Sequence, residues 1–128
     1  MDEKMNKYDL EERLISFAVL IVEIVGEMPD SRVSNHLAGQ LLRSGTSPAL
    51  NYGEAQASES RKDFIHKMKI ALKELRETNV CLKIIYRTKN YKSKGKIESA
   101  LAETNELLSI FVKSVKTALK NIVKESSN

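Results

Sequence analysis

The spacing of the apolar residues restricts the fold of this chain more than any other feature. In four long segments, apolar side chains recur every three or four residues, which is the repeat of one face of an α-helix. No segment shows the strict alternation that a half-buried β-strand requires. The first predicted helix covers residues 6–27, and its stripe consists of Leu10, Leu14, Phe17, Ile21, Ile24 and Met28.

The second predicted helix begins near Ser31 or Ser34 and extends through Gln56. Two interpretations of its middle are open. Either Ser47 caps a new short helix with Pro48 at its first position, or one long helix continues and kinks at Pro48. We favour the kinked continuous helix, because no turn-rich loop separates the two halves. Its expected buried side consists of Leu37, Ala38, Leu41 and Leu42.

The third predicted helix has the clearest start. Ser60 and Asp63 match a capping box just before Phe64, and the apolar repeat then continues to Ile85. The stretch 89–95 ends this helix. The fourth predicted helix covers residues 96–124, and its expected stripe is Ile97, Leu101, Thr104, Leu108, Phe111, Val115, Leu119 and Ile122.

Four long helices with short links near residues 29, 57 and 92 predict one all-α domain over residues 1–128. The expected architecture is an antiparallel up-and-down four-helix bundle whose second helix is kinked near Pro48. Composition agrees, since five Gly and two Pro leave too few turn residues for a β-sandwich or barrel. An aromatic content of 5% argues against a stacking platform for single-stranded nucleic acid.

The chain has a single cysteine, Cys81, so no internal disulfide is expected. It lies within an apolar helical pattern, which favours a buried small hydrophobe over a nucleophile. Acids near the start of the sequence do not fit a signal peptide, and the longest apolar run, residues 17–22, is too short to span a bilayer. We therefore expect a cytoplasmic protein without membrane contact.

Groups that could carry catalysis do not converge in the sequence. His36 and His66 fall on different predicted helices, and neither has a Cys, Asp or Glu at clean ligand spacing. Asp63 and His66 form only one of the carboxylate–His pairs that a di-metal bundle needs twice. A Gly-rich phosphate loop and a Ser/His/acid set are also missing. We expect no enzyme activity, no metal and no cofactor.

The net charge of +4 hides an uneven distribution. Residues 1–30 carry −5 and the other 98 residues carry +9, an asymmetry that points to a polyanion or to a charged neighbour. The candidate nucleic-acid contacts form a stretch without acids, interleaved with two tyrosines: Lys83, Arg87, Lys89, Lys92, Lys94 and Lys96. The alternative is a solvated surface whose cations complement a helix dipole.

Other cations lie elsewhere in the sequence. Lys113, Lys116, Lys120 and Lys124 line one side of the fourth predicted helix. In an antiparallel bundle they lie near the end that carries Arg61, Lys62 and Lys67, so the cations are spread over both ends of the bundle. We expect the acidic first helix to face solvent or a basic neighbouring subunit, away from a bound polyanion.

A polar face interrupts the second predicted helix. Arg43, Ser47, Asn51 and Glu54 are 4, 4 and 3 residues apart and therefore share one side, with Ser44 and Thr46 beside them. Poor helix formers are an odd choice for a merely solvated face. A hydrogen-bonded network that supports the kink or a subunit contact explains them best, while a ligand-facing surface and an incidental cluster stay open.

This region resembles a family of bacterial four-helix-bundle proteins that are encoded in intervening sequences of large-subunit ribosomal RNA genes. The matching positions are Gln40, Leu41, Arg43, Ser44, Ser47, Asn51, Glu54, Ser60, Asp63 and Phe64, with Glu77 at a later family glutamate. The resemblance is specific from residue 40 to residue 78. The chain departs from the family at Gly53–Ala55 and at Lys73–Glu74, which affects local geometry rather than the fold.

The resemblance implies a ring of subunits, commonly a homopentamer, and no established enzyme activity. A distantly similar pentameric bundle is an accessory protein of diversity-generating retroelements, where it is held to bind nucleic acid and the reverse transcriptase. Our hypothesis is therefore a non-catalytic oligomer that binds RNA or DNA through its phosphate backbone. The alternative is a protein-interaction scaffold whose charges serve subunit or partner contacts without nucleic acid.

Overall fold

The computed structural model describes residues 6–126, apart from the side chains of residues 7 and 126. Four helices form within this range: α1 (Lys7–Glu27), α2 (Arg32–Gln56), α3 (Arg61–Thr88) and α4 (Lys94–Ser126). The described residues contain no strand, which agrees with the predicted all-α fold. Over the same residues, none of the helices combines the length and the apolar character needed to cross a membrane.

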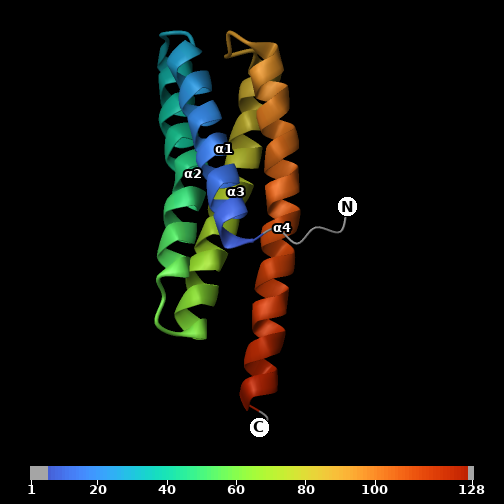
Figure 1. Cartoon of the computed structure of the whole chain (residues 1–128). Helices are drawn as coiled ribbons and strands as arrows, with labels where there is room; N and C mark the ends of the chain where they lie inside the picture. Colours follow the sequence, from blue (N-terminus) through green and yellow to red (C-terminus); the bar gives the residue numbers. More distant parts are fainter. Residues whose placement is uncertain (1–5, 127–128) are drawn as a thin grey trace.

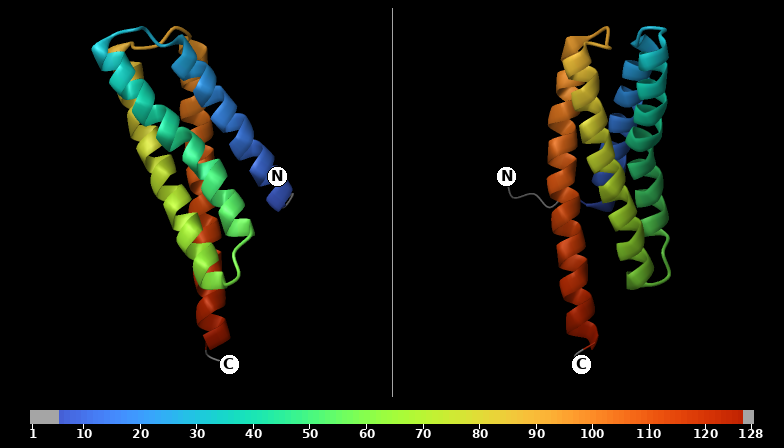
Figure 2. Two further views of the ribbon diagram at one scale, coloured as in Figure 1. Left: turned by 90° about the vertical axis from the view of Figure 1, so that its left-hand side faces the viewer. Right: turned by 180° about the vertical axis from the view of Figure 1, so that it is seen from behind.

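The helices form an up-and-down bundle in which each runs antiparallel to the one before it (Figure 1). α2 packs against α1 and α3, α3 packs against α4, and α1 contacts α4 more lightly. The α1–α2 and α3–α4 loops lie at the same end (Figure 2). α1 begins partway along the bundle, so the last turns of α4 extend beyond it (Figure 1). The predicted ring concerns several chains and stays a prediction.

Side-chain oxygens cap the starts of the first three helices. Asn6 accepts hydrogen bonds from the backbone N–H groups of Tyr8 and Asp9 at 2.9 and 3.0 Å. Ser31 accepts one from the third residue beyond it, and Ser60 accepts one from Asp63 at 3.0 Å. These bonds satisfy N–H groups that have no partner inside a helix. The starts predicted at Ser31 and Ser60 are confirmed.

α2 is one helix from Arg32 to Gln56, with Pro48 buried in its interior. The continuous-helix interpretation is therefore confirmed and the separate short helix is wrong, while a kink at Pro48 stays a prediction. α1 approaches α2 closely at Gly45, where an added Cβ atom would lie 2.8 Å from the Cγ1 atom of Ile21. The absence of a side chain at this position is what allows the two helices to meet.

The core consists of the inward stripes of all four helices, and its largest fully buried side chains include Leu14, Ile21, Leu41, Met68, Leu75, Leu82, Ile97, Leu107 and Phe111. The predicted stripe of α4 is wrong at Leu119, because Ala118 is buried in its place. Ala100 and Leu107 are fully buried as well, and the predicted Leu101 and Leu108 beside them are partly buried against the core. Leu119 is 40% exposed, and Leu42 of α2 is exposed as well. Alanines at inward positions let α4 approach its neighbours. Of the larger residues that follow them, Leu101 lies at the edge of the core and Leu119 is exposed.

Candidate nucleic-acid interface

The six predicted contact residues gather at the end of the bundle that carries the α3–α4 loop. Lys83 and Arg87 lie on α3, Lys89 follows its last residue, and the remaining three lie in the loop and the first turn of α4. Five of the six are exposed, and Lys96 is half-buried. Lys89 adopts the left-handed conformation with φ of 57°, which ends α3. The structure therefore brings these cations to one end of the molecule.

Lys96 has an acidic partner from α1. Its ammonium group forms an ion pair with Glu27, and this hydrogen bond raises the pKa of Lys96. The expectation that the acidic first helix lies away from the candidate surface is therefore wrong at this end. The reason is topological, because antiparallel packing places the last turn of α1 beside the first turn of α4. Lower down, Arg13 of α1 pairs with Glu103 and Glu106 of α4.

The two interleaved tyrosines contact each other. The rings of Tyr86 and Tyr91 stack, with centroids 6.1 Å apart and an interplanar angle of 14°. The Tyr86 hydroxyl donates to Glu98 of α4 at 3.4 Å. Both rings also pack against the core. Their contacts join the loop to the bundle, so the tyrosines help to position the loop cations.

A longer basic surface runs along α3, and the sequence reading missed it. We call it the α3 stripe, and its members are Lys62, His66, Lys69, Lys73, Arg76, Lys83 and Arg87. Val80 lies between Arg76 and Lys83 in this row. Their spacing of three or four residues places them on one face, and all are exposed. At 1.5 Å per residue the stripe is about 37 Å long. The 4–3 spacing of these cations was the signal that could have revealed it.

The members of the α3 stripe form no ion pairs with the acids of α3, although the charge of Lys73 lowers the pKa of the neighbouring Glu74. α3 carries eight Lys and Arg residues and three acids. Two of these acids, Glu74 and Glu77, pair with Arg43 on the side of α2. Among the described residues, no ion pair or side-chain hydrogen bond involves a member of the stripe. Six full positive charges therefore face solvent in a row.

The cations at the start of α3 and the end of α4 have different surroundings. Arg61 pairs with Glu125 at 2.9 Å, and Lys67 pairs with Glu54 at 3.1 Å. A depression of about 320 Å³ joins the two helices, lined by Lys62, Ile65, His66, Lys69, Leu119 and Ile122. On α4, Lys113, Lys116 and Lys120 are exposed. The first half of the α3 stripe thus adjoins the helix that carries these lysines.

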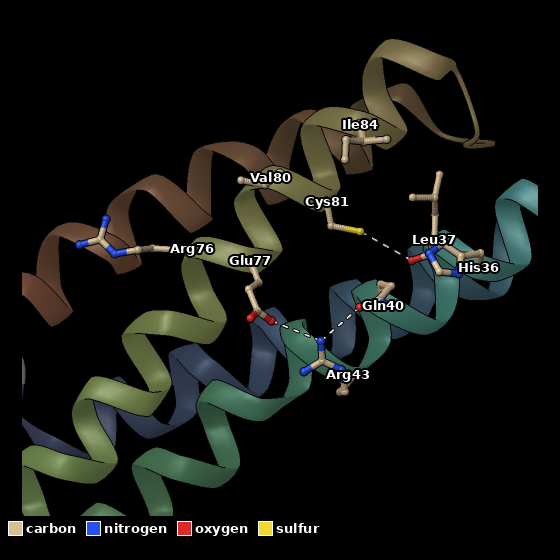
Figure 3. A pocket seen from close by; sticks show the side chains of 9 residues that line it. All are labelled: His36, Leu37, Gln40, Arg43, Arg76, Glu77, Val80, Cys81 and Ile84. Atoms are coloured by element: carbon tan, nitrogen blue, oxygen red, sulfur yellow. Dashed lines mark hydrogen bonds and ion pairs between the residues drawn. The ribbon is translucent and has the colours of Figure 1, made fainter.

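Arg43, from the family-like motif, joins α2 to α3. Its guanidinium donates to Glu74 at 3.2 Å, to Glu77 at 3.3 Å and to Gln40 at 3.2 Å. Glu74 is buried, and burial raises the pKa of its carboxyl group, as does the charge of Glu77, while Arg43 opposes the rise. Figure 3 shows the bonds from Arg43 to Gln40 and Glu77.

The remaining motif residues extend the same side of α2. Asn51 donates to the hydroxyl of Ser47 at 2.9 Å, and Glu54 accepts from Lys67 of α3 at 3.1 Å. The buried Ser44 hydroxyl has no hydrogen-bond partner among the described residues. Within one chain, the motif therefore makes contacts within α2 and between α2 and α3. Its role at a subunit contact or toward a ligand stays a prediction.

A groove of about 510 Å³ lies between α2 and α3 (Figure 3). Its lining residues are His36, Leu37, Gln40, Arg43, Arg76, Glu77, Val80, Cys81 and Ile84. The thiol of Cys81 points toward the backbone carbonyl of Leu37 at 3.7 Å, and burial raises the pKa of that thiol. Cys81 is thus buried as expected, and its thiol is held in the neutral form. Within the described chain, no three His, Cys, Asp or Glu residues come together as metal ligands.

The comparisons with known proteins agree on one family. The model of the 23S rRNA-intervening sequence protein family matches residues 6–113. The chain is also similar to a crystal structure of a protein with unknown function from the S23 ribosomal protein family of Bacteroides thetaiotaomicron. The two are 33% identical, with a TM-score of 0.76 over 84% of this chain and 98% of that chain. No curated protein matches. The chain belongs to the 23S rRNA-intervening sequence protein family.

Proposed function

We propose that the protein is a non-catalytic, self-associating bundle that binds RNA or DNA through the phosphate backbone. The observation that carries this proposal is the α3 stripe, a row of cations that form no ion pair with a described residue. Lys83 and Arg87 belong both to the stripe and to the candidates predicted from the sequence. Lys89, Lys92 and Lys94 extend the basic surface beyond the end of α3, and Lys96, paired with Glu27, contributes least.

The chemistry of the stripe suits phosphates rather than bases. Lys and Arg on one exposed helix face neutralise a polyanion and release its counterions, which gives affinity without a base preference. The stripe contains no aromatic side chain that could stack on a base. The expected ligand is therefore recognised by its charge and shape. For a duplex, six phosphate contacts correspond to a slope of about −5 in a plot of log affinity against log salt concentration.

Fluorescence anisotropy with a labelled duplex tests the proposal. A stripe of about 37 Å covers about 11 base pairs of about 3.4 Å each, so a duplex of about 20 base pairs is long enough. The names of the family and of the solved relative make an rRNA sequence the first probe, with DNA of the same sequence and a scrambled RNA beside it. We expect similar affinities for all three and a steep loss between about 50 and 200 mM salt. Absence of binding at low salt, or binding that salt does not weaken, would overturn the proposal.

The proposal that the protein self-associates rests on exposed apolar side chains. Val19 and Val22 of α1 and Leu50 of α2 are large, apolar and more than half exposed. Contiguous patches of this kind on soluble proteins mark interaction sites. We propose a homo-oligomer, for which the pentamer of the resembling family is the expected size. Light scattering of the purified protein gives the mass directly.

The same observation supports the second candidate function, a scaffold that holds protein partners without nucleic acid. Replacing Lys89, Lys92 and Lys94 together with Lys69 and Lys73 by Glu separates the two functions. Nucleic-acid binding predicts an intact assembly that no longer binds the duplex. The scaffold predicts that the duplex was never bound and that assembly, which depends on the charges, is disturbed.

A further inference from the structure

Between Leu14 and Val25, α1 is apolar on most sides. Its inward stripe fills the core, and its outward side carries a second apolar row at Ile15, Val19 and Val22, spaced 4 and 3 residues apart. Val19 is 53% exposed. A helix that is apolar all round is normally buried on all sides, and a single bundle covers only one side of α1. We therefore expect another protein surface to cover the outward row.

The outward row has an acidic border. Together with Ala49 and Leu50 of α2 it lines a shallow apolar hollow of about 330 Å³. Glu23 lies at the edge of this hollow, and Glu12 is exposed nearby on α1, one turn from Ile15. We call this surface, with its apolar row and acidic border, the α1 ridge. A ridge of this kind fits a groove that is apolar inside and basic at its edges.

The groove between α2 and α3 has that composition. Its interior is apolar, with Leu37, Val80 and Ile84, and Val80 is 56% exposed. Arg43 and Arg76 stand at its edges (Figure 3). Arg43 neutralises Glu77, the acid in the lining, whereas Arg76 has no ion pair with another described residue. Lys83 and Arg87 follow on the same helix and add positive charge beside Ile84.

Charge complementarity decides which surfaces meet. Two α1 ridges facing each other would bring their glutamates together, and two grooves would bring their arginines together. A ridge in a groove places acids against cations and covers apolar side chains on both surfaces. Because the two surfaces are different, each copy still has a free ridge or a free groove for another copy.

We propose that the α1 ridge of one copy docks in the α2/α3 groove of a second copy. This inference rests on the self-association that we propose above, and it adds which two surfaces form the contact. The contact is heterologous, so it continues from copy to copy until a ring closes. Arg76, Lys83 and Arg87 belong both to the α3 stripe and to the border of the groove, so docking covers the upper half of the stripe. Lys62, Lys69 and Lys73, in the lower half, lie outside the contact.

Two aspartate variants test the pairing. Val19→Asp places a charge in the α1 ridge and leaves the groove intact. Val80→Asp places a charge in the groove and leaves the α1 ridge intact. Both positions are exposed, so each variant should fold, which circular dichroism and thermal unfolding check. In mass measurements, we expect an oligomeric wild type and two monomeric variants. Mixed in equal amounts, the variants should form a dimer with one copy of each and nothing larger, because only one intact ridge and one intact groove face each other.

Each other outcome overturns the inference. If Val80→Asp still assembles while Val19→Asp does not, the ridges pair with each other. If both variants assemble like wild type, another surface holds the oligomer. A monomeric wild type would overturn self-association itself, which is a different result from a wrong pairing. Val123→Asp, at an exposed valine near the end of α4, is the control and should leave the mass unchanged. A monomeric Val123→Asp would show that the α1 ridge and the groove are not the determining surfaces.

Discussion

α1 and α3 both pack on α2, yet they are held differently and present different outer faces. α1 meets α2 through close apolar contact at Gly45 and Ile21, and its outer face is apolar with acidic neighbours. α3 meets α2 through ion pairs from Arg43 and Lys67, and its outer face is the α3 stripe. One bundle can therefore carry two kinds of outer face: an apolar face on α1 suited to another protein surface, and on α3 a cationic face whose lower half is left for a polyanion.

The largest expected effect concerns the outer face of α3. Replacing Lys62, Lys69 and Lys73 together by Glu should remove three phosphate contacts outside the docking groove, so the magnitude of the salt slope should fall from about 5 to about 3, with a large loss of affinity at low salt. Replacing the loop cations Lys89 and Lys92 should cost less, because they lie beyond the end of the stripe. Anisotropy titrations at several salt concentrations measure both. Equal losses from the two variants would move the site toward the loop.

The next effect concerns the ion pairs that hold α3. Arg43→Ala leaves the buried carboxylate of Glu74 without its cation, and we expect a loss of about 2 kcal/mol in the free energy of unfolding at neutral pH. Arg76→Ala is the matched control, since Arg76 has no ion pair among the described residues and should cost little. Urea denaturation of the two variants gives the difference. Equal stabilities would show that the Arg43 pair does not hold the helices together.

The loss of stability caused by Arg43→Ala should depend on pH. The pKa of Glu74 lies above its ordinary value, so the folded state takes up the proton more readily than the unfolded state. For this group, stability falls as pH rises through that pKa and recovers as pH falls. Arg43 opposes the rise, so its loss should steepen this dependence. The cost of Arg43→Ala should be full at neutral pH and shrink toward about pH 4, where Glu74 is protonated. A cost that is independent of pH would mean that Glu74 is not the group involved.

The smallest effect concerns the contact that holds α1. Gly45→Ala adds a Cβ atom that would lie 2.8 Å from Ile21, a branched and stiff side chain. We expect overpacking to outweigh the gain in helix propensity and to leave a net loss of about 1 kcal/mol. Gly53→Ala meets no atom within 4 Å, so it should stabilise α2 by up to about 1 kcal/mol. Thermal unfolding compares the two variants, and a stabilising Gly45→Ala would show that α1 is not closely fitted to α2.

Local signals predicted most of the fold. Ser31 and Ser60 act as caps because a hydroxyl three residues before a free N–H is a short-range arrangement, readable from the sequence. The absence of turn residues around Pro48 likewise predicted that α2 continues. The error in α4 has a physical cause: where Ala118 and Leu119 are adjacent, the pattern alone does not say which one faces the core. In the structure the smaller residue of the two is buried, and this depends on how closely the neighbouring helices pack against α4.

The candidate site was harder to predict, because charges are paired between helices. The sequence shows no acid from residue 83 to residue 96, while Glu27 of α1 pairs with Lys96 across the bundle. Conversely, α3 carries Glu74 and Glu77 among its cations in the sequence. In the structure both acids pair with Arg43 of α2, and the members of the stripe form no ion pair with a described residue. Which charges are available to a ligand is a property of the packing, and only the spacing within one helix could be read in advance.

Cys81, the single cysteine of the chain, can be used to probe the region between α2 and α3. Cys81 is buried between α2 and α3, with its thiol near the carbonyl of Leu37 and its pKa raised, so it should react slowly while these helices stay together. Because the chain has one cysteine, every modified molecule records one event at one place. Because Cys81 lines the groove between α2 and α3, the rate of thiol labelling reports how accessible this groove is, and it can be followed in the isolated chain, in the assembly and with nucleic acid present.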